Sequence, residues 1–149
     1  MIIVIPINEF DEKNVYFSDV VKNIVISDSI FIRIYYSTEL FTMNGLYLSF
    51  PLTLSNIEKS YSKTKCSFNS FNNMHTIDKI KMIEQNILKK LELRDKTPIY
   101  KITNQLLEEN IKLYNFDNSI KKNNYNFICK ISGLWDDGNN YGLTYKFIT

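Results

Sequence analysis

Hydrophobic and polar residues alternate over many stretches of the chain, and this period of two predicts β-strands. The predicted strands are residues 2–7, 14–26, 30–37, 46–52 and 110–114 and the two halves of residues 127–147. Pro6 predicts that the first of them is an edge strand or a docked arm, and Asp19 marks a break in the second. A turn is expected at residues 43–45, and loops are expected at residues 62–75 and 115–126.

Between the early and the late strands, the period changes to that of a helix. Residues 76–93 have apolar side chains at helical spacing and lysines near the end, where the helix dipole favours cations. A Thr-Pro pair at residues 97–98 predicts the start of a second, shorter helix, with Ile99, Ile102 and Leu106 as its apolar stripe.

The order of these elements predicts the class of fold. Several strands, a helical insertion and three further strands are typical of an α+β domain with a mostly antiparallel sheet or a small barrel. A chain of 149 residues with 44% hydrophobic residues is long enough for one domain with a core and too short for two, so we expect a single domain over residues 1–149. Because the strands alternate cleanly, one face of the sheet packs and the other meets water or a ligand.

The outer positions of the predicted strands share a pattern of rings and cations. Phe31 and Tyr35 flank Arg33, whose guanidinium stacks well on aromatic faces. Rings stack on bases while Lys and Arg contact phosphates, so the pattern suits a protein that binds single-stranded nucleic acid. The candidate nucleic-acid-binding residues are Phe31, Arg33, Tyr35, Tyr47, Lys112, Lys130 and Lys146.

A purely structural explanation of the same pattern stays open. Tyrosine is a good strand former and lysine is frequent in this chain, so half-exposed strands show both without any ligand. In that case the helices cover Phe31 and Tyr35, and Arg33 pairs with an acid. Trp135 has two alternative positions: the parity of its strand favours the core, whereas the tip of the hairpin would allow it to stack on a base.

The sequence contains no recognisable catalytic motif. Glycine-rich phosphate-binding motifs, the HExxH zinc motif and the GxSxG nucleophile motif are all absent. His75 lies in a predicted polar loop, and Asp136 and Asp137 precede a glycine, where they are typical of a turn. Cys66 and Cys129 have no metal-ligand spacing and are expected to be reduced thiols. We therefore expect no enzymatic activity, no cofactor and no metal.

Charge and hydropathy limit the partners and the location. The formal net charge is +2, so a basic binding site has to be local. No run of about eighteen apolar residues occurs, so we expect no membrane-spanning segment and no membrane partner. The N-terminal sequence lacks the features of a secretory signal, and we expect an intracellular protein.

The segment KISGLWDDGNNYGLTYKF, residues 130–147, resembles the closing hairpin of small proteins from nucleo-cytoplasmic large DNA viruses, in which a K-I-x-G-[IL]-W run, a short acidic turn and G-[LIV]-T-[YF]-K-F recur. Residues 15–23, 31–52 and 97–106 are similar to the corresponding parts of such proteins, so the resemblance covers most of the chain. Some of these viral proteins are grouped with phage-type single-stranded DNA-binding proteins. Those have an OB-fold barrel, a helix before the late strands and a last hairpin with a G-[LIV]-[ST] strand, which Gly142-Leu143-Thr144 matches.

The resemblance implies a mostly antiparallel sheet that closes into an OB-like barrel, with a helical insertion before the last strands. It implies a non-catalytic protein that coats single-stranded DNA in viral replication or recombination, at a replication site in the host cytoplasm or nucleus. A homo-oligomer or other viral replication proteins are the implied protein partners.

One departure from the family pattern concerns the end of the sequence. Replicative proteins of that kind usually end in an acidic tail with a terminal aromatic residue that recruits polymerase partners, whereas this sequence ends in KFIT. We therefore expect either another route of recruitment or a diverged paralogue with a changed task. The alternative function is that of a viral structural or interaction protein, which uses the same barrel face or its open edge to hold a protein partner.

Overall fold

The computed structural model of the protein describes residues 2–22, 29–91, 93, 95–114 and 124–148, and it confirms the predicted α+β class. The strands are β1 (Ile5–Pro6), β2 (Val15–Lys22), β3 (Ile30–Ser37), β4 (Thr42–Asn44), β5 (Leu46–Leu52), β6 (Leu54–Lys59), β7 (Thr64–Phe68), β8 (Thr97–Ile99), β9 (Asn110–Leu113), β10 (Tyr125–Asp136) and β11 (Asn140–Ile148). The helices are α1 (Met74–Leu91), α2 (Lys101–Leu107) and a short 3₁₀ helix, Glu12–Asn14.

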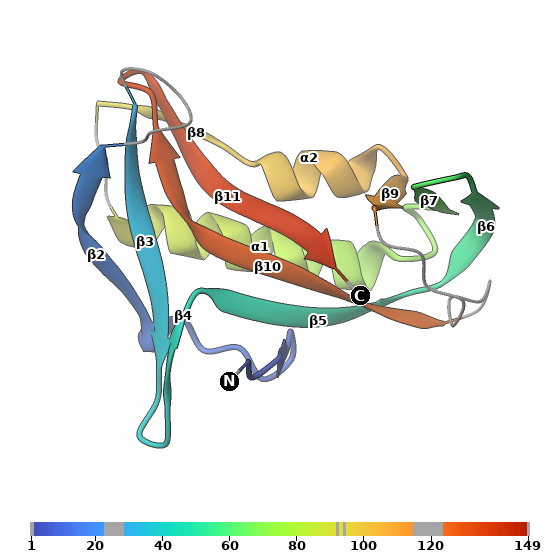
Figure 1. Ribbon diagram of the computed structural model, residues 1–149, viewed down its shortest axis with the longest axis horizontal. Helices are drawn as coiled ribbons and strands as arrows, with labels where there is room; N and C mark the ends of the chain where they lie inside the picture. Colours follow the sequence, from blue (N-terminus) through green and yellow to red (C-terminus); the bar gives the residue numbers. More distant parts are fainter. Residues whose placement is uncertain (1, 23–28, 92, 94, 115–123, 149) are drawn as a thin grey trace.

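The larger sheet contains eight strands and is built around β10 (Figure 1). One edge of β10 pairs with β11, whereas the other edge pairs first with β5 and then with β3. β1 extends the sheet from β5, β8 extends it from β11, and β2 and β4 pair with β3. Within the described residues this path stays open between β1 and β8, so closure into an OB-like barrel stays a prediction.

A β-bulge divides β10 into two segments of opposite parity. The register with β11 shifts at Ser132, which is the extra residue. Ile131 points into the core before the bulge, and Leu134 does so after it. An unbroken alternation would place Trp135 in the core. Because of the bulge, Trp135 lies beside Phe31 of β3 instead.

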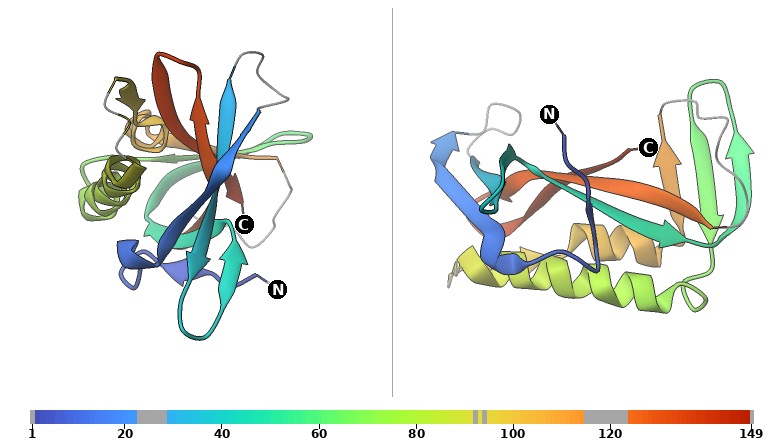
Figure 2. Two further views of the ribbon diagram at one scale, coloured as in Figure 1. Left: turned by 90° about the vertical axis from the view of Figure 1, so that its left-hand side faces the viewer. Right: turned by 90° about the horizontal axis from the view of Figure 1, so that it is seen from below.

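Both helices cover one face of the larger sheet (Figure 1, Figure 2). Ile80 and Ile83 of α1 and Ile102 of α2 line the same small cavity as Leu48 and Cys129 of the sheet. The face turned toward the helices, called the inner face below, therefore forms the main hydrophobic core. The predicted helix over residues 76–93 corresponds to α1.

The second helix begins later than predicted. The Thr-Pro pair at residues 97–98 belongs to β8, an edge strand parallel to β11, where the missing N–H of proline is tolerated. The helix itself, α2, starts at Lys101 and buries Ile102 and Leu106 of the predicted stripe.

Of three early predictions, two agree with the structure and one needs a small change. β1 lies at the edge of the sheet, as predicted, and the register shift of β2 falls between Phe17 and Val20, around the predicted break at Asp19. The predicted turn at residues 43–45 is instead the end of β4 followed by Gly45, whose φ of +97° redirects the chain into β5. Residues 23–26 of the predicted second strand lie outside the described residues.

The strands β6, β7 and β9 form a second, three-stranded antiparallel sheet at one end of the molecule (Figure 1). The prediction of a loop over residues 62–75 is therefore wrong, because β7 lies within it and α1 begins inside its end. Side chains of β7 alternate between buried and partly exposed positions, and the buried Cys66 and Phe68 join the main core. Residues 115–123 of the other predicted loop lie outside the described residues.

Candidate nucleic-acid interface

The face of the larger sheet turned away from the helices carries most of the predicted binding residues; we call it the open face. Its side chains lie in three cross-strand rows, which are Phe31–Trp135–Gly142, Arg33–Gly133–Thr144 and Tyr47–Lys130–Lys146. The first two rows join β3, β10 and β11, and the third joins β5, β10 and β11. The structural explanation required the helices to cover Phe31 and Tyr35 of β3. The helices instead lie on the other face of the sheet and leave these residues uncovered.

Two glycines make room for the aromatic rings of the open face. A Cβ atom at Gly133 would lie 2.6 Å from the ring of Phe31, and a Cβ atom at Gly142 would lie 2.9 Å from the ring of Trp135. Each ring therefore lies directly against a backbone that has no side chain. The two rings are neighbours in the register of β3 and β10, so together they form a short aromatic surface.

A cation lies over each of these two rings. The Arg33 guanidinium carbon is 5.8 Å from the Phe31 ring centroid, and the Lys101 Nζ is 4.5 Å from the Trp135 ring centroid. Arg33 Nη1 also donates a hydrogen bond of 3.1 Å to the amide oxygen of Asn44. Within the described part of the chain, neither cation pairs with a carboxylate, so the expected Arg33–acid pair of the structural explanation is not found.

Two lysines occupy directly opposite positions in the third row. Lys130 faces Lys146 across β10 and β11, and like charges in such positions destabilise a sheet. The Lys130 Nζ lies 5.7 Å from the ring centroid of Tyr47. Tyr47 is on the predicted side but only 8% exposed, so it supports Lys130 instead of offering a free ring for stacking.

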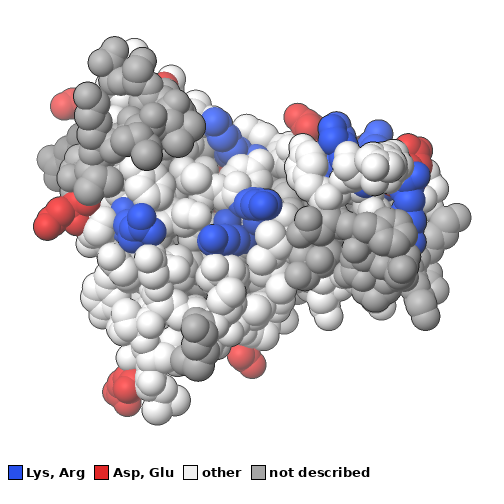
Figure 3. Space-filling model, in the orientation of Figure 1, with Lys and Arg blue, Asp and Glu red and all other residues white. Residues whose placement is uncertain are grey.

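The remaining predicted residues lie away from the three rows. Tyr35 is half-buried between Tyr16 of β2 and Asn44 of β4, at the far end of β3. Lys112 belongs to β9 of the three-stranded sheet and faces Lys65 there. Figure 3 shows two corresponding groups of basic side chains, one over the middle of the larger sheet and one over the smaller sheet, with the visible acidic side chains toward the margins.

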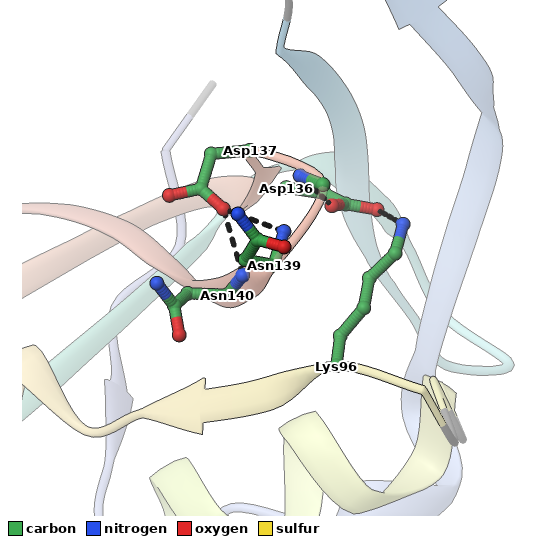
Figure 4. A network of polar contacts seen from close by, with 6 residues as sticks. Lys96, Asp136, Asp137, Asn139 and Asn140 are labelled. Carbon is green, nitrogen blue, oxygen red and sulfur yellow. Dashed lines mark hydrogen bonds and ion pairs between the residues drawn. The ribbon is translucent and has the colours of Figure 1, made fainter.

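Polar contacts at the tip of the β10–β11 hairpin hold the segment next to Trp135 (Figure 4). Asp137 Oδ1 accepts hydrogen bonds of 2.9 and 2.7 Å from two backbone amides of the turn, and these bonds hold the pKa of Asp137 below its usual value. Asp136 accepts a hydrogen bond from a third turn amide and forms an ion pair with Lys96, just before β8. Both carboxylates thus serve the turn, as the sequence predicts.

A buried carboxylate on the inner side positions the start of α2, and with it Lys101. Glu84 of α1 accepts hydrogen bonds from the backbone amides of Ile102 and Thr103, both at 2.9 Å, and from the Thr103 hydroxyl at 2.7 Å. Burial raises the pKa of Glu84, although these hydrogen bonds act in the opposite direction. The Tyr145 hydroxyl adds a hydrogen bond of 3.3 Å to the Lys101 carbonyl oxygen.

Sequence reasoning missed Lys101 as a member of this surface and considered Trp135 there only as the alternative to the core. Lys101 lies outside the predicted strands and reaches the ring of Trp135 from the start of α2. Trp135 lies beyond the bulge, and the isolated Gly133 inside a strand pattern was the available indication of that bulge. No protein-family model, curated protein or solved structure matches the chain.

Two further observations concern other classes of site. Neither helix in the described part of the chain combines the length and the apolar character needed to cross a membrane. Across the same residues, no three His, Cys, Asp or Glu side chains gather as a set that could hold a metal ion.

Proposed function

We propose that the protein binds single-stranded DNA on its open face and does so without catalysis. The observation that carries this proposal is the grouping of rings and of cations that pair with no described carboxylate, on a sheet face that the helices leave uncovered. The groups concerned are the rings of Phe31 and Trp135 and the cations of Arg33, Lys101, Lys130 and Lys146.

The two rings provide stacking surfaces for bases. Base–aromatic stacking contributes roughly 1–3 kcal/mol per base and tolerates any sequence, because every base has an aromatic face. In the free protein, Arg33 and Lys101 lie over these rings. When a strand binds, the bases take these places and the two cations move to the phosphates.

The opposed lysines provide the phosphate contact. A phosphate between Lys130 and Lys146 removes the repulsion that the free protein carries at this row. Such contacts release counterions, so each one lowers log K by roughly 0.7 per decade of salt for a single strand. Affinity is therefore expected to fall steeply as salt is added.

Residues 130–147 resemble small proteins of nucleo-cytoplasmic large DNA viruses, some of which are grouped with phage-type single-stranded DNA-binding proteins, and this resemblance supports DNA as the ligand. The proposal accordingly includes an OB-like arrangement of the strands and a role in coating DNA during replication or recombination of a large DNA virus, inside the infected cell. Other copies of this chain or other replication proteins are the proposed protein partners.

A different surface supports the alternative function, a module that binds a protein partner. Leu40, in the turn between β3 and β4, is 92% exposed. Leu40 also lines a hollow of about 430 Å³ whose other lining residues are Ile5, Tyr36 and Phe41 and the polar Glu9, Asn14, Thr38 and Glu39. An exposed apolar tip beside a hollow of mixed polarity suits a contact with a protein partner.

Charge reversal on the open face tests the proposal. Arg33→Glu combined with Lys130→Glu is expected to weaken oligo-dT binding by more than about tenfold at low salt, because two phosphate contacts become repulsive. The melting temperature should change little, since neither side chain is fully buried. Fluorescence titration and thermal unfolding measure the two effects.

The matched control is Lys81→Glu with Lys89→Glu, which makes the same change of charge on exposed positions of α1. This control should keep its affinity, because α1 lies on the other side of the sheet. Equal losses of oligo-dT affinity in both double variants would mean that net charge alone determines binding, and this result would contradict a defined site. A wild-type protein that binds no oligo-dT at low salt would favour the protein-binding alternative.

A further inference from the structure

The three-stranded sheet carries a basic cluster of its own, which we call the second lysine cluster. It surrounds a hollow of about 290 Å³ that is separate from the open face. The residues that line the hollow are Glu58, Lys59, Ser60, Lys63, Lys65 and Lys112.

The central pair of this cluster has the same arrangement as the pair on the open face. Lys65 of β7 faces Lys112 of β9 directly, as Lys130 faces Lys146. Like charges in these positions destabilise a sheet by roughly 0.2–1 kcal/mol. Within the described residues, neither Lys65 nor Lys112 forms an ion pair.

An acidic neighbour and an aromatic ring complete the surroundings. Glu58 of β6 faces Lys65 from the other side, and its carboxylate accepts a hydrogen bond of 3.2 Å from Asn56. Lys63 Nζ lies 5.4 Å from the ring centroid of Tyr114, which is 62% exposed. The cluster thus combines an excess of positive charge, which attracts the phosphates of a nucleic acid, with an accessible ring, on which a base can stack.

The position of the cluster places it on the path of a strand that crosses the open face. The three cross-strand rows of the open face succeed one another along β10, from Trp135 to Lys130. The start of β10 lies near the three-stranded sheet (Figure 1). Residues 125–130 of β10 cover roughly 17 Å at the rise of a β-strand. Both basic groups are visible from the same side of the molecule (Figure 3).

We propose that the second lysine cluster binds the phosphate backbone of the same DNA strand after that strand has crossed the open face. The cluster then lengthens the binding site and adds affinity only for strands long enough to reach it. This inference rests on the proposed function of the open face.

The test uses oligo-dT of two lengths, about 8 and about 24 nucleotides, of which the first lies within and the second exceeds the roughly 4–16 nucleotides covered by one OB-type site. Lys65→Gln with Lys112→Gln should weaken binding of the long strand by about tenfold and lower its salt dependence by roughly 1.4 log units per decade, the value for two phosphate contacts. Binding of the short strand should be unchanged.

Two comparison variants locate the effect. Lys130→Gln with Lys146→Gln should weaken the binding of both strands, because every strand needs the open face. Lys81→Gln with Lys89→Gln on α1 should weaken neither. Removing the Lys65–Lys112 repulsion should leave the fold intact or slightly more stable, which thermal unfolding checks. Lys63→Gln with Lys112→Gln serves the same purpose should the first double variant fail to fold.

The outcomes separate this inference from the function on which it rests. If the wild-type protein binds both strands and the Lys65–Lys112 variant matches it for both, the second cluster is not part of the site and the open-face proposal stands. If that variant loses the short strand as strongly as the long one, the cluster is not an extension of the site and the inference is wrong. If the wild-type protein binds neither strand, both proposals fail.

Discussion

The two faces of the larger sheet differ in the contacts that their charged side chains make. On the inner side, the buried carboxylate of Glu84 accepts three hydrogen bonds from the start of α2. On the open face, Lys130 and Lys146 face each other, and neither forms an ion pair with a carboxylate of the described residues. Because folding favours the first arrangement and opposes the second, the open face is the surface whose composition needs a reason other than stability.

The same contrast holds for the aromatic residues. Phe50 on the inner side is 1% exposed and packs between Phe127 and Phe147. Phe31 and Trp135 on the open face lie against glycine backbone and remain partly exposed. Rings on the inner side therefore fill the core, whereas rings on the open face keep a surface available to a ligand.

Alanine substitution of one ring on each face gives the largest expected difference. Phe50→Ala should destabilise the protein by about 3–5 kcal/mol, since it leaves a cavity in a packed core. Phe31→Ala should cost only about 1 kcal/mol of stability. It should nevertheless weaken oligo-dT binding by about 5- to 150-fold, equivalent to the stacking of one base. Urea unfolding and fluorescence titration measure the two quantities.

Similar losses of stability for both variants would show that Phe31 is a core residue. Unchanged binding by a folded Phe31→Ala variant would remove this ring from the site.

Substitution of the inner carboxylate gives a smaller effect that depends on pH. In Glu84→Gln an amide NH₂ replaces one of the oxygens that face the backbone amides of α2, which should cost about 1–3 kcal/mol. The pKa of Glu84 in the folded protein is raised above its ordinary value of 4.5. Glu84 therefore contributes stability that is fully present below that ordinary value and is lost as pH rises through the raised pKa.

The difference in unfolding free energy between the wild-type protein and Glu84→Gln should accordingly narrow with rising pH. Urea unfolding of both proteins at about pH 5 and about pH 8 measures this trend, because the two values lie above the ordinary carboxyl range. A difference that widens toward high pH would mean that the ionised carboxylate is the stabilising form, contrary to the account of a desolvated group.

The sequence predicted the faces of the sheet wherever the alternation was unbroken. The inward side chains of β5 and those of β10 before the bulge are buried as expected. With a period of two, these side chains all point to the same face of the sheet, and that face is the buried one. At Ser132 the register shifts by one residue, and every later position of β10 changes face. The alternation of apolar and polar residues does not reveal such a shift. The parity of an unbroken strand therefore favoured the core for Trp135.

Local propensity misled the prediction in two other places. The proline at position 98 is compatible with the first turn of a helix and with an edge strand, and only the pairing of β8 with β11 decides between them. Residues 64–68 do alternate, but their polar surroundings indicated a loop. The contribution of Lys101 to the site depends entirely on tertiary packing, which brings the start of α2 beside the open face.

The most direct test of the open face uses Trp135, the single tryptophan of the chain, as the probe. Its fluorescence should change on titration with oligo-dT, and the affinity should fall by roughly 2.8 log units per decade of salt if Arg33, Lys101, Lys130 and Lys146 each contact a phosphate. An unchanged fluorescence at low salt, together with no oligo-dT binding by anisotropy, would contradict the proposed role of this face.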